Sequence, residues 1–325
     1  MEQPSLTILI TTYNHAIFVD NILQTFFGYL KRGLVFSILI SDDHSSDNTY
    51  EIYQKWAKQI KNLEYYSHDQ NLGMDENFKT AYSHCKTKFC WLLGDHRMIS
   101  FEEMKELLDE VNQEKYDAWI LKTRSENHFP TKVYADVNVL LREIGYNITN
   151  NASCVIPTSF FQECCYKRYM GTTFLHMGIF IDNLCLKNDF KVKYLCDIFV
   201  QNIDIPGEGG TGWSAHPFLN FGVWWYQFIM SLPSQVTLET KEFVLKEHNK
   251  ITNLFSYENV LRHMLLPNRH VYKSSYLKCR KYFKFVEYRP IFFYDVTICC
   301  VPEFVYSILN NVIRKLTGKF RVLMI

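Results

Sequence analysis

The stretch WLLGDHRMIS, residues 91–100, runs from apolar residues directly into a carboxylate, an imidazole and a guanidinium. Residues 89–93 are apolar throughout, which predicts a buried strand that ends just before these charges. Open α/β sheets bind their ligands at the carboxyl ends of their strands, so Asp95, His96 and Arg97 stand where a metal ion or a phosphate would bind. The alternative is an ordinary charged loop between a strand and the next helix.

The rest of the amino-terminal part alternates between apolar runs and segments with helical spacing. Strands are predicted over residues 6–11, 36–41, 63–67, 89–93 and 117–123. Apolar strands separated by helices are typical of a parallel sheet that is covered on both faces.

The pattern loosens beyond about residue 130. Further strands are expected over 153–157 and 197–203, and the glycine-rich segment 205–213 is expected to be a loop. Beyond that segment the chain is expected to form aromatic-rich helices. We therefore predict a mostly parallel α/β domain over residues 1–215 and a basic, helical region over residues 216–325.

Composition limits the class of protein. Hydrophobic residues make up 47% of the chain and charged residues 21%, which is typical of a globular protein. Ten cysteines without a secretory leader favour a reducing compartment, and we expect a cytoplasmic protein. No stretch is long and apolar enough to predict a transmembrane helix.

The carboxyl-terminal region is basic. Residues 271–325 carry ten Lys or Arg against three acidic residues, whereas the whole chain has a net charge of +1. Such a segment indicates an anionic partner, either a membrane surface or nucleic acid. Apolar residues also recur there at helical spacing, which favours a helix at the inner face of a membrane; these residues are Val305, Ile308, Leu309, Val312, Ile313 and Leu316. A helix packed on its own protein is the alternative.

Each of the first four predicted strands is followed by a polar loop. In chain order these loops carry Thr11 with Tyr13, then Asp43, then Asn71 with Gly73, then Asp95. Turn and helix-cap chemistry accounts for any one loop alone. Four such loops meeting at one edge of a sheet favour a binding site.

These loops carry a series of motifs. TTYN (11–14), SDDHSSDNT (41–49), NLG (71–73) and WLLGDH (91–96) follow one another in this order. The series resembles the inverting family 2 glycosyltransferases, which have the GT-A fold, and in particular the abequosyltransferase-like enzymes of bacterial surface polysaccharide synthesis. The resemblance is specific over roughly residues 5–100 and weaker over 150–215.

The resemblance implies a set of substrates and binding residues. It implies a nucleotide-diphosphate-sugar donor, a divalent cation (Mn²⁺ or Mg²⁺), and a lipid-linked or oligosaccharide acceptor, with no role for nucleic acid. The implied nucleotide-binding residues are Thr11, Tyr13, Asp43, Asn71 and Gly73, and Asp95 is the implied metal ligand at the diphosphate.

The metal motif departs from the family pattern. His96 replaces a common acid, and imidazole suits Mn²⁺ better than Mg²⁺. Arg97 is a candidate to pair directly with phosphate oxygens. Metal dependence is therefore open.

Inverting transfer also needs a general base, which deprotonates the acceptor hydroxyl. Asp182 stands at the interval that the resemblance implies, and His176 is its competitor. Trp213, in the glycine-rich loop, resembles an acceptor-side aromatic residue of the family.

Other classes of protein fit less well. A sugar nucleotidylyltransferase needs a glycine-rich, arginine-containing loop after the first strand, and a dinucleotide-binding dehydrogenase needs G-x-G-x-x-G there. TTYNHA, residues 11–16, provides neither. A catalytically inactive nucleotide-binding or scaffold module stays open, because the metal motif is altered.

Overall fold

The computed structural model describes residues 3–125, 128–206, 208, 216–266 and 269–317. The chain divides into two compact units, of which the first comprises residues 1–208 and 231–237 and the second residues 209–230 and 238–325. The second unit thus begins before the predicted boundary at residue 215, and a short later segment belongs to the first unit. Each unit is described by itself.

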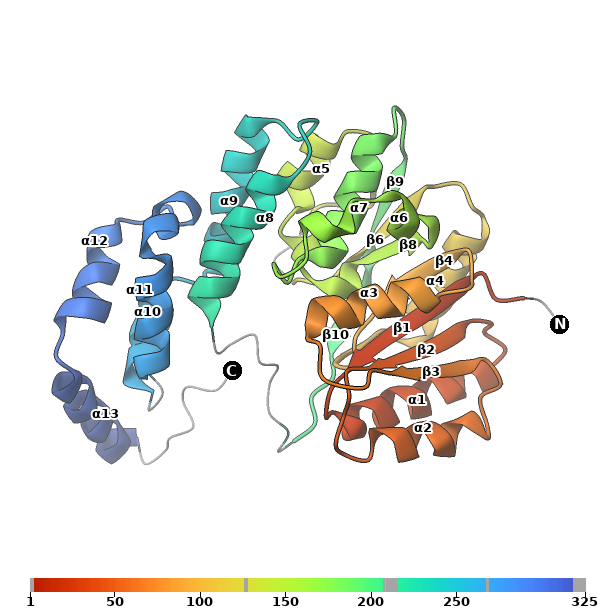
Figure 1. Cartoon of the computed structure of the whole chain (residues 1–325), viewed down its shortest axis with the longest axis horizontal. Helices are drawn as coiled ribbons and strands as arrows, with labels where there is room; N and C mark the ends of the chain where they lie inside the picture. Colours follow the sequence, from red (N-terminus) through yellow and green to blue (C-terminus); the bar gives the residue numbers. More distant parts are fainter. Residues whose placement is uncertain (1–2, 126–127, 207, 209–215, 267–268, 318–325) are drawn as a thin grey trace. The chain divides into compact units, whose positions relative to one another are not determined.

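An eight-stranded sheet forms the centre of the first unit (Figure 1). Its strands are β1 (Leu6–Thr12), β2 (Ser37–Asp42), β3 (Leu63–Ser67), β4 (Phe89–Leu92), β6 (Ala118–Lys122), β7 (Lys132–Tyr134), β8 (Cys154–Pro157) and β9 (Val192–Phe199). Their order in space is β3-β2-β1-β4-β8-β6-β9-β7. Strands β3, β2, β1 and β4 are parallel, and β8 and β7 run antiparallel to their neighbours.

A second, two-stranded ladder lies beside the end of β4. It pairs β5 (Arg97–Met98) with β10 (Gln201–Asn202) in antiparallel fashion. The backbone N–H of Ile203 also donates to the carbonyl of His96, at 2.9 Å. These bonds hold the chain directly after Asp95 in a defined extended conformation.

Helices cover both faces of the sheet. They are α1 (Ala16–Lys31), α2 (Thr49–Ala57), α3 (Met74–His84), α4 (Phe101–Asn112), α5 (Val137–Ile144), α6 (Ser159–Glu163) and α7 (Leu175–Leu186), with short 3₁₀ turns at Asn147–Thr149, Asn151–Ser153 and Tyr166–Arg168. Alternate residues of β1, such as Leu6, Ile8 and Ile10, are fully buried in one core with apolar residues of α1 and α4. The residues between them are buried too, so both faces of β1 are covered.

The predicted amino-terminal half is confirmed, and the second half of the sheet differs in detail. β9 begins before the predicted segment 197–203 and lies inside the sheet, with β7 at the edge. β5, β7 and α5 were not predicted, because their sequences are too short for periodicity to be seen.

The second unit is helical, as predicted. It contains a π-helical turn (Leu219–Trp224), α8 (Trp225–Ser231, whose last residue belongs to the first unit), α9 (Leu238–Thr252), α10 (Tyr257–Leu265), α11 (Arg269–Val286), α12 (Ile291–Tyr294), a second π-helical turn (Asp295–Cys300) and α13 (Glu303–Thr317). Its core is aromatic. Phe218 stacks on Phe255 with ring centroids 4.8 Å apart and also contacts Tyr276 and Phe283.

Within the described ranges, no single helix has the length and apolar composition needed to span a membrane. One pair of successive helical segments, 291–300 and 303–312, passes that test only when both parts are counted across their 88° bend.

Candidate functional site

The polar loops that follow β1, β2, β3 and β4 lie at one edge of the sheet, as the sequence predicted. The strands pair in parallel, with Thr12 opposite Asp42 and Asp42 opposite Ser67. The backbone N–H of Asp43 donates to the carbonyl of Thr12 at 3.0 Å, which continues the pairing past the strand ends. The carboxyl edge therefore gathers the predicted binding residues of this half.

Asp43 organises the loop after β3. Its Oδ1 accepts the backbone N–H of Leu72 and its Oδ2 that of Gly73, both at 2.8 Å. Gly73 has φ +87°, a conformation that favours glycine, and it is the N-cap of α3. Asp43 is itself buried, whereas Tyr13 is 44% exposed at the end of β1. Asp43 thus shapes the loop in addition to lining the edge; Thr11 is buried in β1 and Asn71 is exposed.

His15 occupies the N-cap position of α1 without capping it. Asp47 does so instead, because its Oδ2 accepts the backbone N–H of Ala16 at 2.9 Å. An N-cap residue usually uses its side chain on the first turn of the helix. Here the imidazole of His15 is free to turn toward Asp95.

Asp95 lies between two imidazoles. Its Oδ2 is 2.9 Å from Nδ1 of His15, and its Oδ1 is 2.5 Å from Nδ1 of His96. The two rings meet edge to face, with centroids 4.5 Å apart, and His96 stacks on Phe18 at 3.9 Å. Gly94, with φ +76°, makes the turn that brings Asp95 here from β4.

Electrostatics couple these three groups. The hydrogen bond with Asp95 raises the pKa of His15, against the lowering effect of burial. Burial by itself raises the pKa of Asp95, but the hydrogen bonds with His15 and His96 outweigh it and hold the pKa below its usual value. The arrangement favours an ionised carboxylate next to a histidine that gains a proton readily.

The donor set fits a transition-metal cation. His15, Asp95 and His96 each offer one ligand atom, and these atoms lie within 4.8 Å of one another. Nε2 of His96 is buried and has no hydrogen-bond partner in the described part of the chain. Two imidazoles and one carboxylate suit Mn²⁺ better than Mg²⁺, which prefers oxygen ligands.

Arg97 follows this group on β5, beside the site. It is half-buried, and its guanidinium has neither an ion pair nor a hydrogen bond with any residue in the ranges that the structure covers. Burial and the charge of Arg124 lower its pKa to about 10.

The two candidate bases both lie on α7. The carboxylate of Asp182 accepts hydrogen bonds from the backbone N–H of Cys165 at 3.2 Å, from Arg168 at 3.4 Å and from the hydroxyl of Tyr169. Three donors on a carboxylate that is 5% exposed are typical of a structural role. Asp182 as the base therefore stays a prediction that these contacts do not favour.

His176 stands in the first turn of α7 and is also buried. Its ring meets Phe78 edge to face at 6.0 Å, and neither ring nitrogen has a hydrogen-bond partner among the described residues. Burial lowers its pKa to about 4, so it is neutral near pH 7. Trp213, the predicted acceptor-side residue, lies outside the described residues.

The sequence did not identify His15 or Arg124 as site residues. His15 follows TTYN at a helix start, where Ser, Thr, Asp or Asn is usual, and that departure was the available signal. Arg124 lies two residues after β6, in the looser part of the pattern, and carried no comparable signal.

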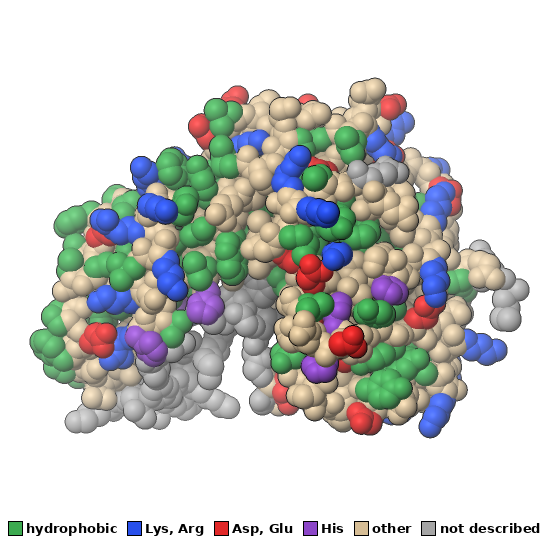
Figure 2. Space-filling model, viewed as in Figure 1, with side chains coloured by type: hydrophobic (Ala, Val, Ile, Leu, Met, Phe, Trp, Pro, Cys, Tyr) green, Lys and Arg blue, Asp and Glu red, His purple; other side chains and the backbone are tan. Residues whose placement is uncertain are grey.

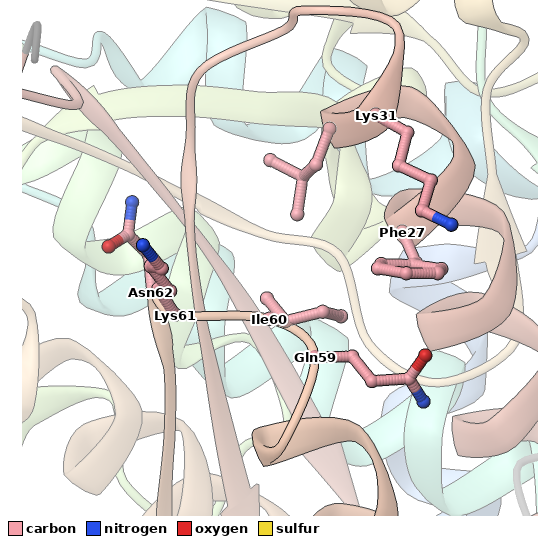
Figure 3. A pocket seen from close by; sticks show the side chains of 7 residues that line it. Phe27, Lys31, Gln59, Ile60, Lys61 and Asn62 are labelled. Atoms are coloured by element: carbon pink, nitrogen blue, oxygen red, sulfur yellow. The ribbon is translucent and has the colours of Figure 1, made fainter.

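A small cavity lies away from these groups. It has a volume of about 240 Å³ and is lined by Phe27, Leu30, Lys31, Gln59, Ile60, Lys61 and Asn62 (Figure 3). These residues belong to the end of α1 and to the segment before β3. The cavity is thus at the amino-terminal edge of the sheet, and its lining contains no carboxylate, imidazole, hydroxyl or thiol.

Comparison with known proteins finds a family match in the amino-terminal part of the chain. Residues 7–167 match the family described as Glycosyl transferase family 2. The match covers just under half of the chain and assigns a family 2 domain to that segment, so the resemblance predicted from the motifs is confirmed there.

Two curated relatives support this assignment. An abequosyltransferase of Salmonella typhimurium is 30% identical over 100 residues, which is 30% of this chain and 30% of the relative. An uncharacterized glycosyltransferase of Mycoplasma genitalium is 27% identical over 118 residues, or 35% of this chain and 40% of the relative. The matched part is thus less than half the length of either relative.

Solved structures show the fold. S. aureus TarS in complex with UDP-GlcNAc is similar with a TM-score of 0.60 and 14% identity, over 98% of this chain and 93% of that chain. The mannosyltransferase from Pyrobaculum calidifontis in complex with GDP-Man and Mn²⁺ has a TM-score of 0.51 and 12% identity, over 98% and 89%. The predicted GT-A fold is confirmed.

Proposed function

We propose that this protein transfers a sugar from a nucleotide-diphosphate donor, with inversion, to a lipid-linked or oligosaccharide acceptor in cell-surface polysaccharide synthesis. The observation that carries the proposal is the position of Asp95, which lies just after β4, between His15 and His96, at the same sheet edge as the loop held by Asp43. The family match and the likeness to an abequosyltransferase support it.

The nucleotide would bind over β1, β2 and β3. Asp43 fixes the Leu72–Gly73 turn, so backbone groups of that turn are preorganised toward the ligand. Tyr13 offers a half-exposed ring beside it, and Thr11 and Asn71 complete the proposed binding residues. Preorganisation of this loop would lower the entropy cost of binding the donor.

The diphosphate would bind at Asp95. A divalent cation held by His15, Asp95 and His96 would neutralise the charge that develops on the leaving nucleotide. Without a cation, His15 would instead bind a proton, since Asp95 raises its pKa, and the protonated ring would contribute positive charge at the same place. UDP-GlcNAc in TarS, and GDP-Man with Mn²⁺ in the mannosyltransferase, support a nucleotide sugar and a cation as ligands.

The base would come from α7. We retain Asp182 and His176 as the two candidates. The ring nitrogens of His176 have no hydrogen-bond partner among the described residues, whereas the carboxylate of Asp182 already accepts hydrogen bonds from the protein. Trp213 would contact the acceptor.

A panel of nucleotide sugars tests the proposal. The thermal midpoint of the full chain would be measured with UDP-, GDP-, CDP- and dTDP-sugars, with and without Mn²⁺. A ligand at 100 times its Kd stabilises the native state by about 2.7 kcal/mol, so one member should raise the midpoint clearly. If no member shifts it, with or without Mn²⁺, the proposed donor site is wrong.

An inactive nucleotide-binding module is the second candidate, and one observation favours it. Both oxygens of Asp95 already have imidazole partners, so the carboxylate is less available than an unpaired one. A bound nucleotide sugar that releases no nucleotide over a day, in the presence of Mn²⁺ and of acceptor lipid extracts, would support this candidate over the enzyme.

We also propose that the second unit docks on an anionic membrane, as a peripheral protein of the inner face. Large apolar side chains are exposed on its last helices: Phe292 (77%), Phe304 (65%), Ile308 (56%), Val312 (46%) and Leu309 (42%). Exposed Lys278, Lys281 and Lys284 lie on α11 of the same unit, and Figure 2 shows basic and hydrophobic side chains interspersed there. Ile313 and Leu316 lie outside the described side chains.

Vesicle binding of the full chain tests the docking surface. Replacing both Phe304 and Ile308 by Ser should weaken binding to phosphatidylglycerol vesicles at least tenfold, because each buried apolar side chain contributes roughly 1.5–3 kcal/mol. The matched control is Leu238→Ser, a 60% exposed residue of α9. Equal binding of the double variant and the wild type would contradict the proposal.

A further inference from the structure

Arg97 is a half-buried guanidinium that the described protein leaves without an anion. Its backbone is fixed, because Arg97 pairs with Asn202 in the β5–β10 ladder. The nearest acid in sequence, Asp95, has both oxygens on His15 and His96. Burying a charge without a partner is unfavourable, so this position calls for an anion from outside the chain.

A second guanidinium lies close to it. Arg124 follows β6, and its Nε and Nη2 donate to the carbonyl of Tyr146 and to Oγ1 of Thr149, each at 3.3 Å. Buried Asn147 holds the same segment, since its Oδ1 accepts the backbone N–H of Thr123 at 2.9 Å. Arg124 is near enough for its positive charge to act on Arg97. Two like charges thus repel each other at this point of the edge.

The topology places this pair away from the nucleotide loops. β4 and β6 both run antiparallel to β8, which lies between them, so their carboxyl ends share one edge. Arg97 and Arg124 follow those two strands. The loops of Asp43 and Gly73 follow β2 and β3, on the other side of β1. Asp95 follows β4, two residues before Arg97, so it is the part of the proposed donor site that is nearest to Arg97 in sequence.

We propose that Arg97 and Arg124 bind a phosphate group of the acceptor. This inference rests on the proposed transferase function, which places the donor over β1 to β3 and its diphosphate at Asp95. Guanidinium groups bind phosphate oxygens in bidentate fashion, and a phosphate carries enough negative charge to offset two cations. The acceptor is thus a phosphate-bearing lipid or glycan, and the pair selects it and positions its hydroxyl near Asp95.

Calorimetry of the full chain with inorganic phosphate tests the pair, with and without saturating UDP. Phosphate should bind in both conditions. Arg97→Gln and Arg124→Gln should each weaken phosphate binding about tenfold, the loss expected for one charge-assisted hydrogen bond, and change UDP affinity less than twofold. Lys105→Gln, at an exposed position of α4, removes a positive charge elsewhere and should change neither the phosphate affinity nor the UDP affinity. Arg97→Lys retains the charge and should lose part of the affinity.

Each outcome decides one point. Phosphate binding that both Gln variants retain would overturn the pair as an anion site. Complete displacement of phosphate by UDP, or an equal loss of UDP affinity in the variants, would assign the arginines to the donor diphosphate instead. Tighter binding of glucuronate than of phosphate would replace the phosphate by a carboxylate. If wild type binds phosphate but no nucleotide, the proposed function fails while the anion site stands.

Discussion

Asp95 and Asp182 were both predicted from the sequence as site carboxylates, and both are nearly buried, at 9% and 5% exposure. Asp95 lies in the loop after β4, and its partners are two imidazoles. Asp182 lies within α7, and its partners are a backbone N–H, an arginine and a tyrosine hydroxyl. Imidazoles change charge near neutral pH and bind metals, whereas the donors around Asp182 do neither. The partners of a buried carboxylate thus distinguish a reactive group from a structural one.

The largest effect is expected at Asp95. Asp95→Asn should lower the rate of sugar transfer by a factor on the order of 10² to 10³. The reason is that the cation, or protonated His15, that would offset the charge of the diphosphate loses its carboxylate partner. The free energy of unfolding should fall as well, because the charge-assisted hydrogen bonds with His15 and His96 are lost. Steady-state nucleotide release with the best donor of the panel measures the rate. Asp109→Asn, an exposed residue of α4, is the control; a wild-type rate in Asp95→Asn would remove Asp95 from the site.

For Asp182 we expect a loss of stability without a large loss of transfer rate. Asp182→Asn should lower the free energy of unfolding by about 2 to 3 kcal/mol, since a charge-assisted network is lost, and change the transfer rate of the folded protein less than threefold. Tyr169→Phe, which removes one of the donors, should reproduce part of the loss of stability. Urea unfolding and transfer assays on the same samples separate the two effects.

A hundredfold loss of transfer in Asp182→Asn at unchanged stability would instead identify the base. It would also show that the partners of a carboxylate are a poor guide in this family.

The two aspartates also show what the sequence can predict. The spacing of apolar runs predicted β1 to β4, and therefore that Asp43 and Asp95 would share one edge. It did not predict that the Asp43 carboxylate would accept the backbone N–H groups of Leu72 and Gly73. Nor did it predict that the side chain of His15, at the N-cap of α1, would contact Asp95. Strand order follows from local patterns, whereas side-chain partners depend on loops that meet only after folding.

His176 extends the comparison to pH. Its pKa is about 4 in the folded protein and about 6.5 when unfolded, so unfolded molecules bind the proton first as the pH falls. Stability from the neutral ring is full above pH 6.5 and is lost toward pH 4. Between pH 7 and pH 5 the loss should be about 2 kcal/mol. Urea midpoints of wild type and His176→Gln measure it, and an equal slope in both would exclude His176 as the source.

The smallest effect is expected at Asp43, where the carboxylate acts through a loop. Asp43→Asn replaces one acceptor by a donor opposite the backbone N–H of Leu72 or Gly73. UDP affinity should fall about five- to tenfold, or roughly 1 kcal/mol, by calorimetry. Asp69→Asn, exposed in the same loop, is the control. Unchanged affinity would mean that the nucleotide does not use this turn.

The course of the chain between the two units has a consequence for dissecting the protein. Residues 209–230 belong to the helical unit, residues 231–237 return to the sheet unit, and the chain then re-enters the helical unit. Phe218 comes from the first of these passages and Phe255 from the second, and their rings stack in one core. No single cut of the gene therefore separates the two units intact. Truncating the chain after residue 237 would remove the aromatic partners of Phe218. The two units therefore have to be expressed together in one chain.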